Sequence, residues 1–212
     1  MIKVYKVLTL VFALFILTVS LTSQKSAASV PDYFPLRVGD SWKYRSIGED
    51  SEYTVKVVSA EKQADGTMLY LLEKLAGVKI DDWYSRTDGW VLMHREAYTE
   101  QPGLEVKYQP ARQYLKNPLV VGEKWNWKGK SVTQAEAGES NEVVGTEMIE
   151  VPAGRFRAMK IVSQVSDGGA VKTRTSWYAD GVGLVKTTTE AGQIKYGFEL
   201  VDYSFKKASP KK

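Results

Sequence analysis

The stretch FPLRVGDSWKYRS, from Phe34 to Ser46, returns in altered form as NPLVVGEKWNWKG, from Asn117 to Gly129. Both contain P-L-x-V-G, then an acid, then W-x-aromatic. The proline suits the start of an edge strand or a turn, because it has no N–H. The glycine, Gly39 or Gly122, is predicted to have a positive φ, and the acid after it can accept backbone N–H groups. The motif therefore predicts a chain reversal followed by a strand whose tryptophan fills the core.

A second landmark follows the first in each half of the sequence. Trp83-Tyr84 stands just before Asp88-Gly89, and Trp177-Tyr178 stands just before Asp180-Gly181. Two landmarks in the same order, about 85 residues apart, are typical of a tandem duplication. We therefore predict one domain over residues 30–205. It would consist of a first repeat over 33–116 and a second over 117–204, with the tryptophans of both halves filling a shared interior.

Alternation of side chains with period two dominates the chain after residue 30. In VKTRTSWYA, from Val171 to Ala179, successive residues fall on opposite faces, as in a half-buried strand. Turn dipeptides such as Asp-Gly separate these segments at short intervals. Pro110–Leu115 is the one segment compatible with a helical turn, with the proline at its first position. We predict an all-β fold of ten to twelve strands, arranged as a curved antiparallel sheet, half-barrel or sandwich.

The N-terminus has the features of a secretory signal peptide. Lys3 and Lys6 precede an apolar run from Val7 to Thr22, and Ser26-Ala27-Ala28 then supplies the small residues that signal peptidase requires. This predicts a signal peptide over 1–28, with cleavage one residue later as an alternative. The apolar run is short for a membrane span of about 20 residues, so an uncleaved anchor is the second interpretation. Either way, we predict an extracytoplasmic protein: secreted, periplasmic or at the cell surface.

Composition and charge exclude several classes of protein. The chain has no cysteine, which excludes disulfides, thiolate chemistry and the lipidated cysteine of a bacterial lipoprotein. Its formal charge is +4, but removing the three lysines of residues 1–28 and the four of the basic tail, 206–212, leaves 22 basic and 25 acidic residues. A nucleic-acid partner is not expected, because the cations lie at the chain ends. We expect membrane contact only through an uncleaved signal or the basic tail.

No constellation of catalytic residues stands out in the sequence. His94 is the only histidine, and it lies in an expected strand where a structural role is the simpler interpretation. Asp81 and Asp82 are neighbours in an expected strand, so their carboxylates point to opposite faces and cannot converge on one atom. No phosphate-binding loop, nucleophile elbow or Ca²⁺ loop is present. We therefore predict no enzymatic activity, no catalytic residue, no metal ligand and no cofactor.

Aromatic residues provide the candidates for binding. The chain has 6 Trp and 12 Tyr, most of which are expected in the core. Trp90 stands where the second half has Val182, and Trp127 stands where the first half has Tyr44. Residues that differ between the two halves are less constrained by the structure that the halves share, and can therefore serve binding. We therefore name Trp90 and Trp127 as the candidate ligand-binding residues.

The second half contains V-P-A-G-R-F, from Val151 to Phe156, and W-Y-A-D-G-V-G-L-V-K, from Trp177 to Lys186. With P-L-x-V-G-x-x-W, these motifs resemble a group of uncharacterised exported bacterial β-domains found in secreted proteins and lipoproteins. The resemblance covers about Tyr33 to Ser204 and is clearest after Asn117. It implies a curved, half-open β-sheet similar to those that carry lipoproteins or hydrophobic ligands across the periplasm. It implies no catalytic residue.

Four functions are compatible with the sequence. The leading hypothesis is a non-catalytic exported module that holds an apolar or amphipathic ligand, or a partner protein, on a concave sheet face. A module that binds cell wall or polysaccharide through Trp90, Trp127 and the basic tail is the second hypothesis. A structural subunit of a surface assembly is the third, and an enzyme is the last.

Overall fold

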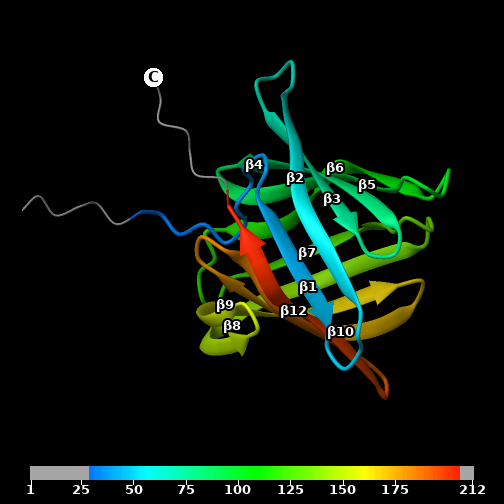
Figure 1. Cartoon of the computed structure of the whole chain (residues 1–212). Helices are drawn as coiled ribbons and strands as arrows, with labels where there is room; N and C mark the ends of the chain where they lie inside the picture. The colour runs from blue at the N-terminus through cyan, green and yellow to red at the C-terminus, as the bar shows by residue number, and fades with distance from the viewer. Residues whose placement is uncertain (1–28, 206–212) are drawn as a thin grey trace, which may run out of the picture.

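The computed structural model describes residues 29–205, and every regular element within that range is a β-strand (Figure 1). The predicted signal peptide and basic tail lie outside the described residues. The strands are β1 (Ser41–Ser46), β2 (Glu52–Lys62), β3 (Met68–Leu75), β4 (Lys79–Thr87), β5 (Gly89–Tyr98), β6 (Glu105–Asn117), β7 (Lys124–Lys130), β8 (Glu136–Val151), β9 (Gly154–Asp167), β10 (Ala170–Ala179), β11 (Gly183–Ala191) and β12 (Ile194–Ser204).

The twelve strands form one antiparallel sheet in the order β6-β5-β4-β3-β2-β1-β12-β11-β10-β9-β8-β7. Each strand pairs with the next strand in sequence, except that β6 and β7 do not pair and form the two edges of the sheet. In addition, β1 pairs with β12, which joins the two halves. The sheet curves until its edge strands, β6 and β7, approach each other, which gives a nearly closed barrel (Figure 1). The prediction of an all-β, strongly curved antiparallel sheet is confirmed.

The helical turn predicted at Pro110–Leu115 is wrong, because this segment lies inside β6. Proline is tolerated there for two reasons. β6 is an edge strand, so one side of its backbone bonds to no neighbour in the sheet. In addition, the register with β5 is interrupted between the pairs Met93–Arg112 and Arg95–Lys107, which leaves Pro110 in an irregular stretch.

The two P-L-x-V-G segments make the same reversal. Gly39 has φ 95° and Gly122 has φ 89°, so the predicted positive φ is confirmed. The N–H of Gly39 donates to the carbonyl of Val57, and that of Gly122 donates to the carbonyl of Val143, each over 2.8 Å. Both valines are fully buried, and each stands next to a register shift in the sheet. The two turns are therefore tied in the same way to the second strand of their own half.

The two Trp-Tyr pairs also occupy equivalent places, in β4 and β10, each at a register shift against the following strand. These correspondences agree with a duplicated unit of six strands. The duplication itself stays a prediction.

The expectation that the tryptophans of both halves fill the interior is only partly right. Trp42 lines the interior, but in the Trp-Tyr pairs it is the tyrosine, Tyr84 or Tyr178, that does so. Neighbours in a strand point to opposite faces, so Trp83 and Trp177 lie on the outer face. Charged side chains cover both: Arg95 lies over the ring of Trp83, and Lys160 and Lys186 lie over that of Trp177.

We predict that Gly122→Ala lowers the free energy of unfolding by about 1–2 kcal/mol, because a β-carbon at positive φ is strained. Nothing lies within 4 Å of the added carbon, so strain alone is responsible. Gly122→Asn is the matched control, and its free energy of unfolding should fall less because asparagine tolerates a positive φ better than alanine does. Urea unfolding monitored by tryptophan fluorescence measures both variants. Equal losses in the two would contradict the strain explanation.

Candidate functional site

The sheet curves around a cavity of about 890 Å³ that is partly open to solvent. Its walls come mainly from β1–β4 on one side and β10–β12 on the other, so the β1–β12 junction runs along it. The lining residues are Phe34, Pro35, Trp42, Tyr44, Ser46, Ser51, Glu52, Tyr53, Val55, Leu72, Lys74, Ala76, Gly77, Tyr84, Tyr114, Lys172, Arg174, Tyr178, Gly183, Leu184, Thr187, Thr189, Tyr196 and Phe198.

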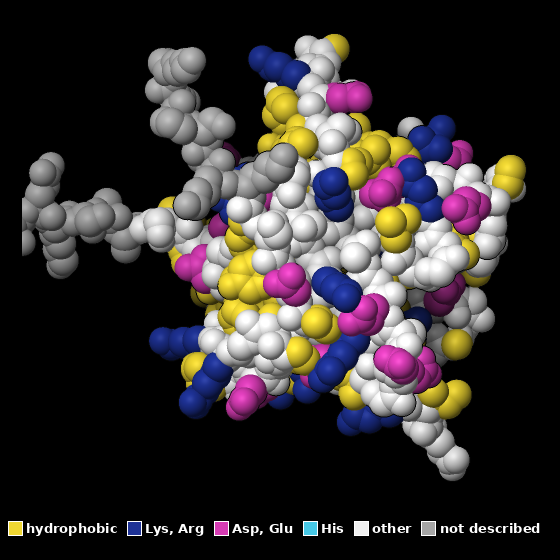
Figure 2. All heavy atoms as spheres, in the orientation of Figure 1, with side chains coloured by type: hydrophobic (Ala, Val, Ile, Leu, Met, Phe, Trp, Pro, Cys, Tyr) yellow, Lys and Arg dark blue, Asp and Glu magenta, His cyan; other side chains and the backbone are white. Residues whose placement is uncertain are grey.

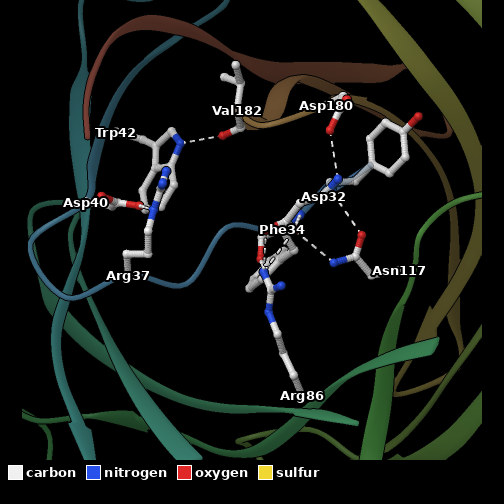
Figure 3. A network of polar contacts seen from close by, with 10 residues as sticks. Asp32, Phe34, Arg37, Asp40, Trp42, Arg86, Asn117, Asp180 and Val182 are labelled. Carbon is white, nitrogen blue, oxygen red and sulfur yellow. Dashed lines mark hydrogen bonds and ion pairs between the residues drawn. The ribbon is translucent and has the colours of Figure 1, made fainter. Parts of the chain in front are cut away.

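A segment that we call the strap, residues 30–36, closes one end of the barrel (Figure 3). Its anchor is Asp32, whose carboxylate accepts hydrogen bonds from Arg86 and Asn117, each over 2.9 Å. The backbone N–H of Asp32 donates to the Asp180 carboxylate over 2.7 Å, and its carbonyl accepts from the N–H of Gly181 over 2.8 Å. The strap thus joins strand ends of both halves.

The cavity extends from the strap toward the opposite end of the barrel. Phe34 lines it at the strap. Ser46 and Ser51 line it at the β1–β2 turn, and Ala76 and Gly77 line it at the β3–β4 turn. β1 runs away from the strap and β3 runs in the same direction as β1, so both turns lie at the end remote from the strap. We call this end the mouth.

Aromatic rings dominate the cavity wall. Tyr44 stacks on Tyr53 with centroids 5.0 Å apart, and Phe198 meets Tyr53 edge-on at 5.0 Å. Near the strap, Phe34 packs against Tyr84 at 5.2 Å. The polar atom of Tyr44 is satisfied by the wall itself, since its hydroxyl donates to the carbonyl of Leu184 over 2.9 Å. The rings can therefore present apolar faces to the cavity.

Burial keeps these phenols neutral. It raises the pKa of Tyr44, Tyr84 and Tyr178 well above the ordinary value, and nearby acids or tyrosines raise it further. The wall thus gains no negative charge from these three tyrosines at physiological pH.

Buried ion pairs lie beside the cavity. Glu139 of β8 is only 8% exposed and lies between two guanidiniums, with Arg112 at 2.6 Å and Arg174 at 2.9 Å. Burial alone would raise the pKa of Glu139, but the two arginines more than offset it and hold that pKa below the ordinary value. The Arg112–Glu139 pair also bridges the gap between the edge strands, because Arg112 belongs to β6 and Glu139 to β8.

A second ion pair joins Lys74 of β3 to Asp82 of β4 over 2.5 Å. Burial would lower the pKa of Lys74, but Asp82 and the nearby Glu96 together raise it above the ordinary value. Glu96 of β5 shows the opposite balance, because burial raises its pKa more than Lys74 lowers it. Lys74 therefore stays protonated beside the cavity.

The predicted binding residues Trp90 and Trp127 do not line this cavity. Trp90 packs edge-on against Trp125 at 6.1 Å, with the ammonium of Lys116 5.4 Å from its ring centre. Trp127 packs edge-on against Tyr108 at 5.6 Å, on the inner side of β7. Both half-buried tryptophans lie near the β6–β7 gap. Their role in binding stays a prediction.

His94 and the Asp81-Asp82 pair are also placed by the structure. The His94 ring nitrogen Nε2 lies 2.7 Å from the hydroxyl of Ser85, and burial lowers the pKa of His94. Asp82 points to the interior, whereas Asp81 lies on the other face of β4, as the alternation predicted. Within residues 29–205, no three His, Asp or Glu side chains are grouped so that they could hold a metal ion.

Sequence reasoning missed the charged residues of the interior. A signal for some of them was present, because Lys172 and Arg174 alternate in phase with Tyr178 in VKTRTSWYA. Arg112 and Glu139 carried no such signal, since they lie on different strands and meet only when the sheet closes.

Comparisons with known proteins support the fold. A family model described as DUF3108-like matches residues 120–192. No curated protein matches the chain in sequence. A candidate lipoprotein from Parabacteroides distasonis ATCC 8503 superposes with a TM-score of 0.51 and 15% identity, over 83% of this chain and 100% of that chain. A candidate exported protein with a YmcC-like fold from Bacteroides fragilis NCTC 9343 superposes with a TM-score of 0.53 and 16% identity, over 82% of this chain and 100% of that chain. At these identities, the similarity shows a shared fold alone.

We predict that Glu139→Gln lowers the free energy of unfolding by about 3 kcal/mol, because it leaves the buried Arg112 without its countercharge. Glu150→Gln is the matched control on the same strand. Glu150 is exposed, and its variant should change stability by no more than about 0.5 kcal/mol. Urea unfolding measures both. A loss below about 1 kcal/mol for Glu139→Gln would show that the pair is not needed to close the sheet.

Proposed function

We propose that the protein is a non-catalytic exported module that holds an apolar or amphipathic ligand inside its barrel. The observation that carries the proposal is the cavity of about 890 Å³ with its aromatic wall and one strapped end. Binding cavities for small molecules commonly have volumes of about 300–1,000 Å³ and mostly apolar walls with a few polar groups. A concave face that holds a ligand was expected from the sequence, and a cavity of this volume lined by the inner face of the sheet favours a small molecule over a partner protein.

The extracytoplasmic location is supported from two sides. Residues 1–28 have the features of a signal peptide. The two similar solved structures are described as a candidate lipoprotein and a candidate exported protein. No helix within residues 29–205 is long and apolar enough to cross a membrane.

The non-catalytic character is supported by the chemistry of the interior. Two of its carboxylates, Asp82 and Glu139, are engaged in ion pairs with Lys74, Arg112 and Arg174, and a third, Glu96, accepts a hydrogen bond from the Tyr108 hydroxyl. His94 does not line the cavity. These two carboxylates are therefore held by cations and are not placed as a nucleophile with a base.

The tandem duplication belongs to the same proposal. A cavity along the β1–β12 junction takes its wall from both halves, so a doubled unit would have created the site at the place where the copies join. The matching turns at Gly39 and Gly122 support this origin.

A structural subunit of a surface assembly is the second candidate. The observation that favours it is the pair of edge strands, β6 and β7, which share no backbone ladder within the described residues. Exposed edges can pair with another chain. Pulldown of a stoichiometric partner that is lost when β6 carries additional prolines would favour this candidate.

We predict that linear alcohols bind with affinity that rises about fourfold per methylene from 1-octanol to 1-dodecanol, because each buried methylene contributes about 0.8 kcal/mol. Isothermal titration of the mature protein measures the series. Val55→Trp places a large ring in the cavity and should weaken dodecanol binding at least tenfold, as a roughly 1.4 kcal/mol loss of burial would. Val171→Trp is the control on the exposed outer face and should leave binding unchanged. Absence of saturable binding, or equal loss in both variants, would contradict the proposal.

A further inference from the structure

Three cationic side chains line the cavity: Lys74, Lys172 and Arg174. The carboxylates that pair with two of them, Asp82 and Glu139, are buried in the interior and are not among the residues that line the cavity. The residues that line the cavity therefore include three cations and one acid, Glu52.

Lys172 differs from the other two cations. It is half-buried, and it forms no ion pair with any carboxylate of residues 29–205. Arg174 shares its only carboxylate, Glu139, with Arg112, so two guanidiniums face one negative charge. The one acid of the cavity lining, Glu52, lies 2.6 Å from Lys43, which neutralises it. An excess of positive charge thus remains on the inner face of β10.

The excess lies toward the mouth. β10 ends at Ala179, and the next residue, Asp180, binds Asp32 of the strap. The earlier residues of β10 therefore lie farther from the strap. Lys172 and Arg174 are two residues apart on the same face, and Tyr178 follows deeper on that face. From the mouth inward, the wall therefore changes from cations to aromatic rings, and the aromatic wall continues to Phe34.

The face of the molecule in Figure 2 has no comparable excess of positive charge. Over the face of the molecule shown in Figure 2, basic and acidic side chains are interspersed, and no large area of one sign is present. The cavity is suited to electrostatic selection of a ligand because Lys172 and Arg174 line it and water screens buried charges less than charges at the surface.

We propose that the ligand is a single-chain amphiphile with an anionic head group, which Lys172 and Arg174 bind near the mouth while its apolar chain lies along the aromatic wall toward Phe34. This inference rests on the proposed function, because it requires that the cavity holds a ligand. A carboxylate or phosphate head would accept charge-assisted hydrogen bonds from both cations. The chain would gain its affinity from burial against the rings.

The test compares three probes with the same twelve-carbon chain: dodecanoate, 1-dodecanol and dodecylammonium. Each is titrated into the mature protein at pH 8, below its critical micelle concentration, by isothermal titration calorimetry. Dodecanoate should bind at least tenfold more tightly than dodecanol, since a hydrogen bond to a charged group supplies about a factor of ten or more. Dodecylammonium should bind most weakly. Dodecyl phosphate in a fourth titration distinguishes a phosphate head from a carboxylate.

Lys172→Gln should lower dodecanoate affinity about tenfold and leave dodecanol affinity unchanged. Lys172→Glu should reverse the order and favour dodecylammonium. The control is Lys195→Gln, which removes an exposed lysine that pairs with Glu190 near the β11–β12 turn and does not line the cavity. It should change none of the three affinities.

The outcomes separate the two proposals. If none of the probes binds, the proposed function and this inference both fail. If all three bind with equal affinity, ligand holding stands and the anionic head group is overturned. A preference for dodecanoate that persists in both Lys172 variants also overturns the inference.

Discussion

The pairing of β1 with β12 is the constraint on which the rest of the structure depends. It makes one sheet from two halves of six strands, and without it each half would have another exposed edge. Trp42 and Tyr44 of β1 and Phe198 of β12 line the cavity at this junction. The strap adds a second connection, because Asp32 binds Arg86 of the first half and Asp180 of the second. The cavity therefore exists only while the two halves are joined.

The buried ion pairs matter less for the stability of the fold than for the charge of the interior. Desolvation offsets much of the attraction within a buried pair, and apolar side chains of similar volume often serve folding as well. Lys74–Asp82 and Arg112–Glu139–Arg174 are thus a costly way to fill a barrel. Two of their cations, Lys74 and Arg174, line the cavity, whereas their carboxylates do not, and this arrangement suits a ligand of opposite charge.

The fold could be predicted from local patterns, and the site could not. Turn glycines such as Gly39 and two-residue alternation are set by nearby atoms, so they identified the strands and the reversals. The helical turn predicted at Pro110 was wrong because a strand tolerates this proline only when the strand is at the edge of the sheet, which is a property of the whole sheet. The expectation that Trp177 fills the interior failed for a related reason. Alternation separates the two faces of a strand but does not say which face is inside. The Arg112–Glu139 contact required the closed sheet.

The central claim is that the interior holds an apolar chain, and the most direct measurement is a crystal structure of the mature protein with 12-bromododecanoate, using the anomalous signal of bromine. The account predicts one strong bromine peak inside the barrel near Phe34 and Trp42, with the carboxylate at Lys172. Bromine found only on the outer surface at saturating ligand, or a barrel whose side chains fill the interior, would contradict it.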